Sequence, residues 1–126
     1  MLLEAMQMHV MGNHDAAEPL YTSSIRSAHA HKFIHEEGIA SELTGDFLYE
    51  QGRQSEAYAL YMHSIKCYIK WDALAVGMRV EADIERKFES GILSQLRKAA
   101  NHVDETMKRI LDDDSADTNK RPSEEM

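Results

Sequence analysis

Three histidines lie close together near residue 30, and their type makes them candidate metal ligands. His29, His31 and His35 fall within seven residues. Two histidines four residues apart on one helix share a face, as metal ligands often do. However, the sequence predicts a break between two helices at residues 33–34, which separates His31 from His35. We therefore expect structural or solvated histidines, with His35 near the start of the next helix, and no metal site.

The segment that begins at His35 does not complete a catalytic motif. The stretch HEEGI differs from the HExxH pattern of zinc hydrolases because position 39 is Ile39. Glu36 and Glu37 suit a helix start, where the helix dipole stabilises negative charge. The six glycines do not cluster with a lysine as a phosphate-binding loop requires. The sequence thus predicts no catalytic residue, no cofactor and no enzymatic activity.

Composition limits the compartment and the partners. The single cysteine, Cys67, cannot form an intramolecular disulfide, and a fold without disulfides suits a reducing, cytoplasmic location. We expect Cys67 to be a packed, unreactive thiol. The net charge of −8 and the lack of a basic stripe argue against a nucleic-acid partner. Apolar runs are too short to span a membrane, so we expect no membrane partner.

The spacing of apolar residues predicts helices and no strands. Apolar residues recur three and four positions apart, and only two prolines and six glycines interrupt them. Gly12 and Gly52 are placed to end helices. Sequential amphipathic helices with short connections are expected to pack antiparallel. The predicted helices cover residues 1–11, 15–31, 34–51, 54–70, 72–88 and 92–111.

A stretch of fourteen residues occurs twice, forty positions apart. GNHDAAEPLYTSSI, from Gly12, aligns without a gap with GRQSEAYALYMHSI, from Gly52, and six residues are identical. A repeated helix–turn–helix unit cannot bury its apolar face alone, whereas stacked units bury a continuous core. Small residues such as Ala17, Ala57 and Gly45 mark places where two helices approach closely. The fold class is therefore all-α, an α-solenoid fragment of antiparallel helical hairpins.

The chain divides into three predicted regions. Residues 1–88 form the helical repeat domain, whose last helix caps it. Residues 89–111 form a longer C-terminal helix, and residues 112–126 form a disordered acidic tail. The apolar seam of residues 92–110 either packs on the repeats or pairs with another helix, and the second alternative predicts self-association.

Gly45, Gly52, Ala57 and Tyr61 provide a small, a turn, a small and an aromatic residue at intervals of seven, five and four positions. This pattern resembles the tetratricopeptide repeat (TPR), although the period here is forty rather than about thirty-four residues. The resemblance implies TPR-like hairpins. In such modules the first helix of each pair lines a groove that binds a partner.

Three further motifs lie within residues 8–88: F-x-HEE from Phe33, GR from Gly52, and Y-x-x-W-x-A-x-A from Tyr68. Together they resemble the helical-repeat segment of large multidomain sensor proteins. In these proteins the segment follows a protein-kinase-like domain and an AAA/STAND-type ATPase, and precedes GAF and histidine-kinase domains. The resemblance implies a scaffold role in signal transduction and transfers no catalytic residue.

These observations predict a non-catalytic protein–protein interaction or scaffold module. The expected partner is a protein or peptide of basic or apolar character. One alternative is a structural fragment of a larger sensor kinase or ATPase that does not act alone. Another is an enzyme or metal protein built on the histidines and glutamates. Transferred by position from TPR-like modules, the candidate partner-binding groove consists of Asp46, Tyr49, Glu50, Met78 and Glu81.

Overall fold

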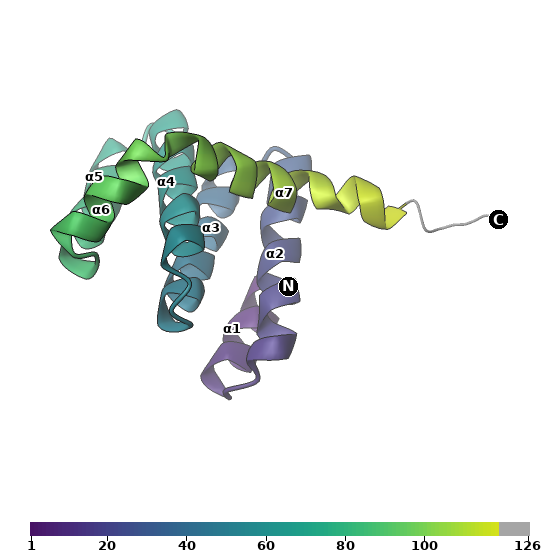
Figure 1. Ribbon diagram of the computed structural model, residues 1–126. Coiled ribbons are helices and arrows are strands. Elements are labelled where there is room, and N and C mark those ends of the chain that lie inside the picture. Colours follow the sequence, from purple (N-terminus) through teal and green to yellow (C-terminus); the bar gives the residue numbers. More distant parts are fainter. Residues whose placement is uncertain (119–126) are drawn as a thin grey trace.

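The computed structural model describes residues 1–118, and residues 119–126 lie outside the described part. The described chain is all-helical and contains no strand, as the sequence predicts (Figure 1). Each helix from α1 to α4 packs against the next one along the chain. The helices are α1 (Leu2–Val10), α2 (His14–Ala30), α3 (Ile34–Glu50), α4 (Gln54–Lys70), α5 (Leu74–Lys87), α6 (Ser90–Lys98) and α7 (Ala100–Thr118).

Four turns of the same geometry join α1 to α5. In each turn the third residue donates its N–H to a carbonyl five residues earlier, as Asn13 does to Met8 at 2.8 Å. This hydrogen bond belongs to the Schellman motif, which satisfies the last carbonyls of a helix. The middle residue has a positive φ, a conformation that favours glycine. The middle residues are Gly12 (82°), Lys32 (61°), Gly52 (79°) and Asp72 (65°).

The turns explain the forty-residue period. Each of α2, α3 and α4 contains 17 residues. A three-residue turn follows each helix. One helix with its turn therefore occupies about 20 residues, so equivalent positions of successive hairpins lie about 40 residues apart, and the small and aromatic residues recur at that interval.

Small residues allow the helices to approach closely, as the sequence predicts. Ala5, Ala17 and Ala57 are fully buried. A Cβ added to Gly45 would lie 2.9 Å from the ring of Tyr61, so α3 and α4 meet where no side chain fits. Around these contacts the core is filled by large side chains, among them Tyr21, Phe47, Leu60, Tyr61 and Ile84.

The segment expected to form one helix over residues 92–111 forms two. Ala99, with φ −96° and ψ 49°, interrupts the helical path between α6 and α7. The bend lets α7 turn back across α4 and α2 (Figure 1). Thr106 and Met107 are buried there. The seam therefore packs on the repeats, the first of the two alternatives, and self-association through it stays a prediction.

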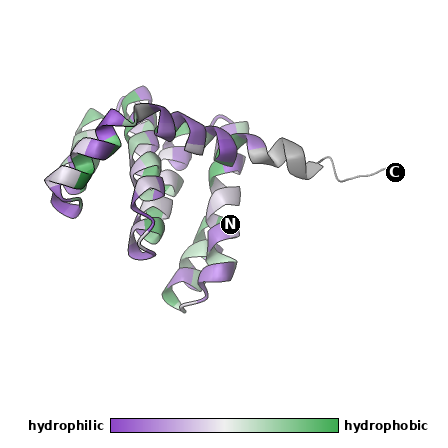
Figure 2. Ribbon diagram, viewed as in Figure 1, coloured by the Kyte–Doolittle hydropathy of each residue, from purple (hydrophilic) through white to green (hydrophobic). Residues whose placement is uncertain are grey.

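α7 extends beyond its packed part. It continues to Thr118 and so includes residues 112–118 of the segment that was predicted as a disordered acidic tail. The rest of the predicted acidic tail lies outside the described residues. Along most of its length α7 is hydrophilic (Figure 2). Among the described residues, no helix has the length and apolar character needed to cross a membrane.

Candidate functional site

Asp46 and Tyr49 of the predicted groove form hydrogen bonds with residues of α4 and α5. Asp46 accepts hydrogen bonds from the hydroxyl of Tyr61 and, at 2.8 Å, from Nζ of Lys87. Tyr49 donates its hydroxyl to the backbone oxygen of Lys87 at 2.7 Å. Burial, together with the hydrogen bond to Asp46, raises the pKa of Tyr61. These two groove residues therefore fasten the end of α5 to α3.

Glu50 lies on the surface at the end of α3 and contacts α1. Its Oε1 is 2.8 Å from Nε2 of His9. The other nitrogen of His9, Nδ1, is 2.8 Å from the hydroxyl of Tyr21. His9 also packs edge-on against the ring of Phe47, with ring centroids 5.0 Å apart. The imidazole thus joins the ends of α1 and α3, and Glu50 remains the exposed carboxylate of this junction.

Met78 and Glu81, the remaining groove residues, are exposed on α5 and lie outside this network. α1 also carries exposed apolar side chains, since Met6 is 38% and Val10 87% exposed. Met6 and Val10 stand forty residues before Asp46 and Glu50. They therefore occupy the equivalent positions in the first hairpin. Neither residue was among the predicted groove residues.

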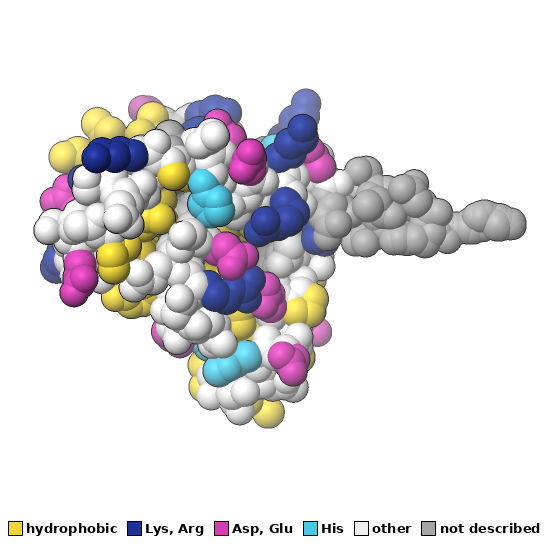
Figure 3. All heavy atoms as spheres, in the orientation of Figure 1, with side chains coloured by type: hydrophobic (Ala, Val, Ile, Leu, Met, Phe, Trp, Pro, Cys, Tyr) yellow, Lys and Arg dark blue, Asp and Glu magenta, His cyan; other side chains and the backbone are white. Residues whose placement is uncertain are grey.

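A hollow of about 660 Å³ lies between α2 and α4. Arg53 spans it, with Nη1 2.7 Å from Oε1 of Glu18 and Nε 2.8 Å from Oε1 of Glu56. The hydrogen bond from Arg53 lowers the pKa of Glu56. Arg109 of α7 also reaches Glu56, at 3.3 Å. Acidic and basic side chains are interspersed on this face (Figure 3), so the hollow is a network of paired charges.

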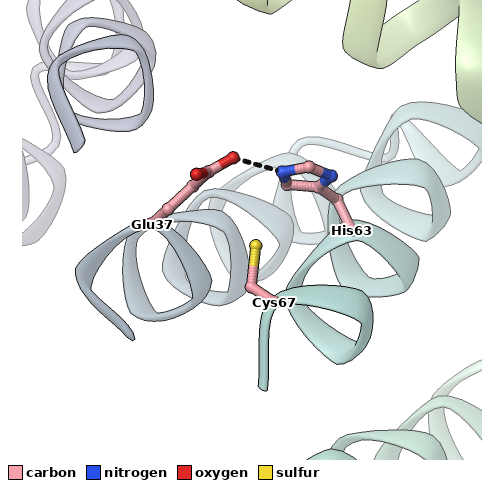
Figure 4. Close-up of side chains that lie close together, drawn as sticks. All are labelled: Glu37, His63 and Cys67. Carbon is pink, nitrogen blue, oxygen red and sulfur yellow. Dashed lines mark hydrogen bonds and ion pairs between the residues drawn. The ribbon is translucent and has the colours of Figure 1, made fainter. Parts of the chain in front are cut away.

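Where α2, α3 and α4 meet, four side chains of metal-ligand type come together. Oε2 of Glu37 lies 2.6 Å from Nε2 of His63 and 3.1 Å from Nδ1 of His29. Cys67 follows His63 by one turn of α4. The ligand atoms of Glu37, His63 and Cys67 lie within 4.8 Å of one another. Figure 4 shows these three side chains pointing into one space.

Three members of the cluster, Glu37, His63 and Cys67, are largely buried, whereas the side chain of His29 is 52% exposed. Burial alone would raise the pKa of Glu37, but hydrogen bonds and charge from His63 and His29 lower it below the ordinary value. The Cys67 thiol behaves in the opposite way, because burial, reinforced by the charge of Glu37, raises its pKa to about 12. A charged carboxylate thus lies beside a neutral thiol and two imidazoles.

Of His29, His31 and His35, only His29 belongs to this cluster. His31 stacks on Phe33, with centroids 5.7 Å apart, and His35 stacks on Trp71, with centroids 4.1 Å apart. His63 was not among the residues predicted from the sequence, although its spacing of four residues from Cys67 places both on one face of a helix. No protein-family model, curated protein or solved structure matches the chain.

Proposed function

We propose that the chain is a non-catalytic protein-interaction module of TPR-like hairpins that binds a basic, amphipathic peptide or helix. The observation that carries this proposal is an apolar stripe on α1. Leu3, Met6 and Val10, spaced by three and four residues, are 68%, 38% and 87% exposed. Neighbouring exposed apolar side chains of this size are typical of interaction surfaces.

The surroundings of the stripe favour a basic partner. Glu50 lies near the C-terminal end of α1, because it contacts His9, the residue before Val10. The chain as a whole has a net charge of −8, which attracts and orients a cationic partner. Met6 contributes a flexible, polarisable thioether, which adapts to partners of different shape. A helix with leucines on one face and lysines beside them would match both the stripe and Glu50.

The resemblance of residues 8–88 to the repeat segment of sensor proteins adds a context to this proposal. It supports a scaffold role in signal transduction in the cytoplasm. No step of the proposal needs a nucleophile or a general base, and the ordered polar groups at the groove, Asp46 and Tyr49, serve to hold α5 against α3.

Two labelled peptides of equal length test the proposal by fluorescence anisotropy. One has leucines three and four positions apart with lysines beside them, so that it is amphipathic as a helix, and the other replaces every lysine with glutamate. We expect the basic peptide to bind with a micromolar Kd and the acidic one not to bind. The double variant Met6→Lys, Val10→Lys should weaken binding about tenfold or more, since it removes apolar contact area and adds positive charge.

The matched control adds the same charge elsewhere. Phe33 and Ile69 are exposed apolar residues, 55% and 53%, outside the stripe. Phe33→Lys, Ile69→Lys should therefore retain most of the affinity. Three outcomes would contradict binding at the α1 stripe. They are equal binding of the two peptides, failure of both peptides to bind, and an equal loss of affinity in the two double variants.

The same stripe also favours the second candidate, a structural segment of a larger helical array. In a stacked array the outer face of a hairpin packs against the preceding hairpin, and Leu3 and Val10 offer such a face. A circular-dichroism melt of the 126-residue chain separates the candidates. A cooperative helical transition of a monomer supports the interaction module, whereas a weak, non-cooperative transition supports the segment.

A further inference from the structure

We propose that His29, Glu37, His63 and Cys67 bind a divalent transition metal, and that Zn²⁺ is the ion that fits them. The proposal rests on the geometry of the buried cluster and is independent of the peptide groove. Imidazole nitrogen, carboxylate oxygen and cysteine sulfur are the ligands that Zn²⁺ takes in proteins, usually four in a tetrahedron. The cluster offers two nitrogens, one oxygen and one sulfur.

The ligand atoms of Glu37, His63 and Cys67 are close enough to share one ion, and His29 reaches this group through its contact with Glu37. With bonds of about 2.0–2.3 Å, the ligands of a tetrahedral Zn²⁺ lie about 3.3–3.8 Å apart. The nitrogens of His63 and His29 are 2.6 and 3.1 Å from the same oxygen of Glu37. The ligand atoms of Glu37, His63 and Cys67 all lie within 4.8 Å of one another. Movements of about 1 Å, which side-chain torsions can supply, would convert the spacings of Glu37, His63 and Cys67 into coordination distances, and rotation of the exposed His29 ring would bring in the fourth ligand.

The fold directs the ligands into one place. His63 and Cys67 are four residues apart on α4 and therefore share a face. Glu37 comes from the first turn of α3 and His29 from the last turn of α2, and the turn at residues 31–33 brings these two helix ends together. A metal here would fix three helices at a single point.

The burial of the ligands and their access to solvent also suit a metal site. The side chains of Glu37 and His63 are only 5% and 12% exposed, so coordination bonds would form away from competing water. The side chain of His29 is 52% exposed and gives the ion a route from solvent. A purely structural role accounts for the hydrogen bond between Glu37 and His63. It does not account for a second imidazole on the same oxygen together with a buried sulfur.

Binding balances charge and protons. The thiol of Cys67 gives its proton to solvent as the Zn–S bond forms, and the carboxylate of Glu37 binds through an oxygen. The ring nitrogens of His63 and His29 that donate N–H to Glu37 lose that hydrogen to solvent or to the other nitrogen of the ring, and each then gives its lone pair to the metal in place of the contact with Glu37. Two negative ligands then neutralise the 2+ charge, so the buried site carries no net charge.

The test uses the full chain, stripped with a chelator, dialysed and kept reduced. Zn²⁺ is titrated by isothermal calorimetry, and Co²⁺ is added as a spectroscopic substitute. We expect one equivalent of Zn²⁺, a higher Tm because the metal binds only the folded state, and the near-ultraviolet absorption of a thiolate–Co²⁺ bond. The Co²⁺ spectrum needs no variant, so a folded wild-type chain that lacks the thiolate band overturns the proposal.

Variants then identify the ligands, with circular dichroism to confirm that each one folds. Cys67→Ser should abolish the thiolate band and weaken Zn²⁺ binding about tenfold or more, and Glu37→Gln should also weaken it. His31→Gln is the matched control, because His31 is exposed and stacks on Phe33 outside the cluster. Unchanged Zn²⁺ affinity in Cys67→Ser, or an equal loss in His31→Gln, would show scattered surface binding and reject the site.

Discussion

Gly45 sets the distance between α3 and α4, and its substitution gives a residue-scale prediction. A Cβ at this position would lie 2.9 Å from the ring of Tyr61. That ring cannot retreat easily, since its hydroxyl is bonded to Asp46 and Lys87. We expect Gly45→Ala to lower the free energy of unfolding by about 1–3 kcal/mol, the usual cost of overpacking a core. Urea denaturation followed by circular dichroism measures the change.

Gly91 provides the control for this substitution. It lies in the first turn of α6, where an added Cβ meets nothing within 4 Å. Gly91→Ala should leave stability unchanged or raise it by up to about 1 kcal/mol, because alanine has fewer unfolded conformations and a higher helix propensity. If the two variants behave alike, the close approach at Gly45 is not what makes glycine necessary there.

Single residues differ in how far the sequence could predict their roles. Gly45 and Ala57 were identifiable because close helix packing repeats at equivalent positions. The meeting of Glu37 with His63 and Cys67 was not predicted, because it depends on the register of α3 against α4, which no local pattern encodes. Asp46 was predicted as a groove residue, and its ion pair with Lys87 at the end of α5 was not predicted, because it depends on how α5 packs against α3.

The helices and their turns were the most predictable elements. The turns at Gly12 and Gly52 were predictable because a positive φ favours glycine at these positions. Asp72 adopts the same conformation without that signal, and α5 consequently begins at Leu74 rather than at the predicted residue 72. The break at Ala99 carries no glycine or proline either, so the interruption of the helix follows from packing of α7 on α4 and α2.

α7 is held to the repeats by its buried side chains, and Met107 tests this at the scale of the element. Met107 is 6% exposed. Met107→Ala should lower the free energy of unfolding by about 2–4 kcal/mol, because it removes buried apolar contact and leaves a cavity. Met78 is the matched control, since it is 61% exposed and Met78→Ala should change stability by less than about 0.5 kcal/mol. Equal effects in urea denaturation would place α7 outside the cooperative fold.

Arg53 connects α2 to α4 through Glu18 and Glu56, which predicts a pH dependence. The hydrogen bond from Arg53 lowers the pKa of Glu56 below its ordinary 4.5, so the unfolded chain binds this proton more readily than the folded chain. The stabilisation is therefore complete above about pH 4.5 and is lost as the pH falls through the folded pKa. Because the ion pair is partly exposed, we expect a contribution of about 1 kcal/mol.

The measurement is the free energy of unfolding between about pH 3 and pH 6. Glu56→Gln should be less stable than the wild type near pH 6, and its stability should fall less steeply toward pH 3. Glu105→Gln removes an exposed carboxylate of α7 and serves as the control for the lost charge. A wild-type slope that persists in Glu56→Gln would contradict the assigned role of the Arg53 hydrogen bonds.

At the scale of the whole molecule, α7 packs against helices that are far from it in the sequence. In a simple solenoid each helix contacts only those adjacent in sequence, so an end hairpin can open alone. Here α7 packs on both α4 and α2 and so joins the first hairpin to the second. Arg26 of α2 adds a hydrogen bond from Nε to the backbone oxygen of Ile110 at 2.8 Å.

Native-state hydrogen exchange tests this bridging. The first variant, Val103→Asp, Met107→Asp, places two charges in the interface that α7 makes with α4. The second variant, Gln95→Asp, Asn101→Asp, adds the same charge at exposed positions. We expect the first variant to lower amide protection in α1 and α2 more than in α3 and α4, since the first hairpin loses its contact with α7 while α3 and α4 keep each other. The second variant should exchange like the wild type. If protection falls by the same amount in every helix, the chain unfolds as one unit, and the stability of the first hairpin does not depend on the bridge.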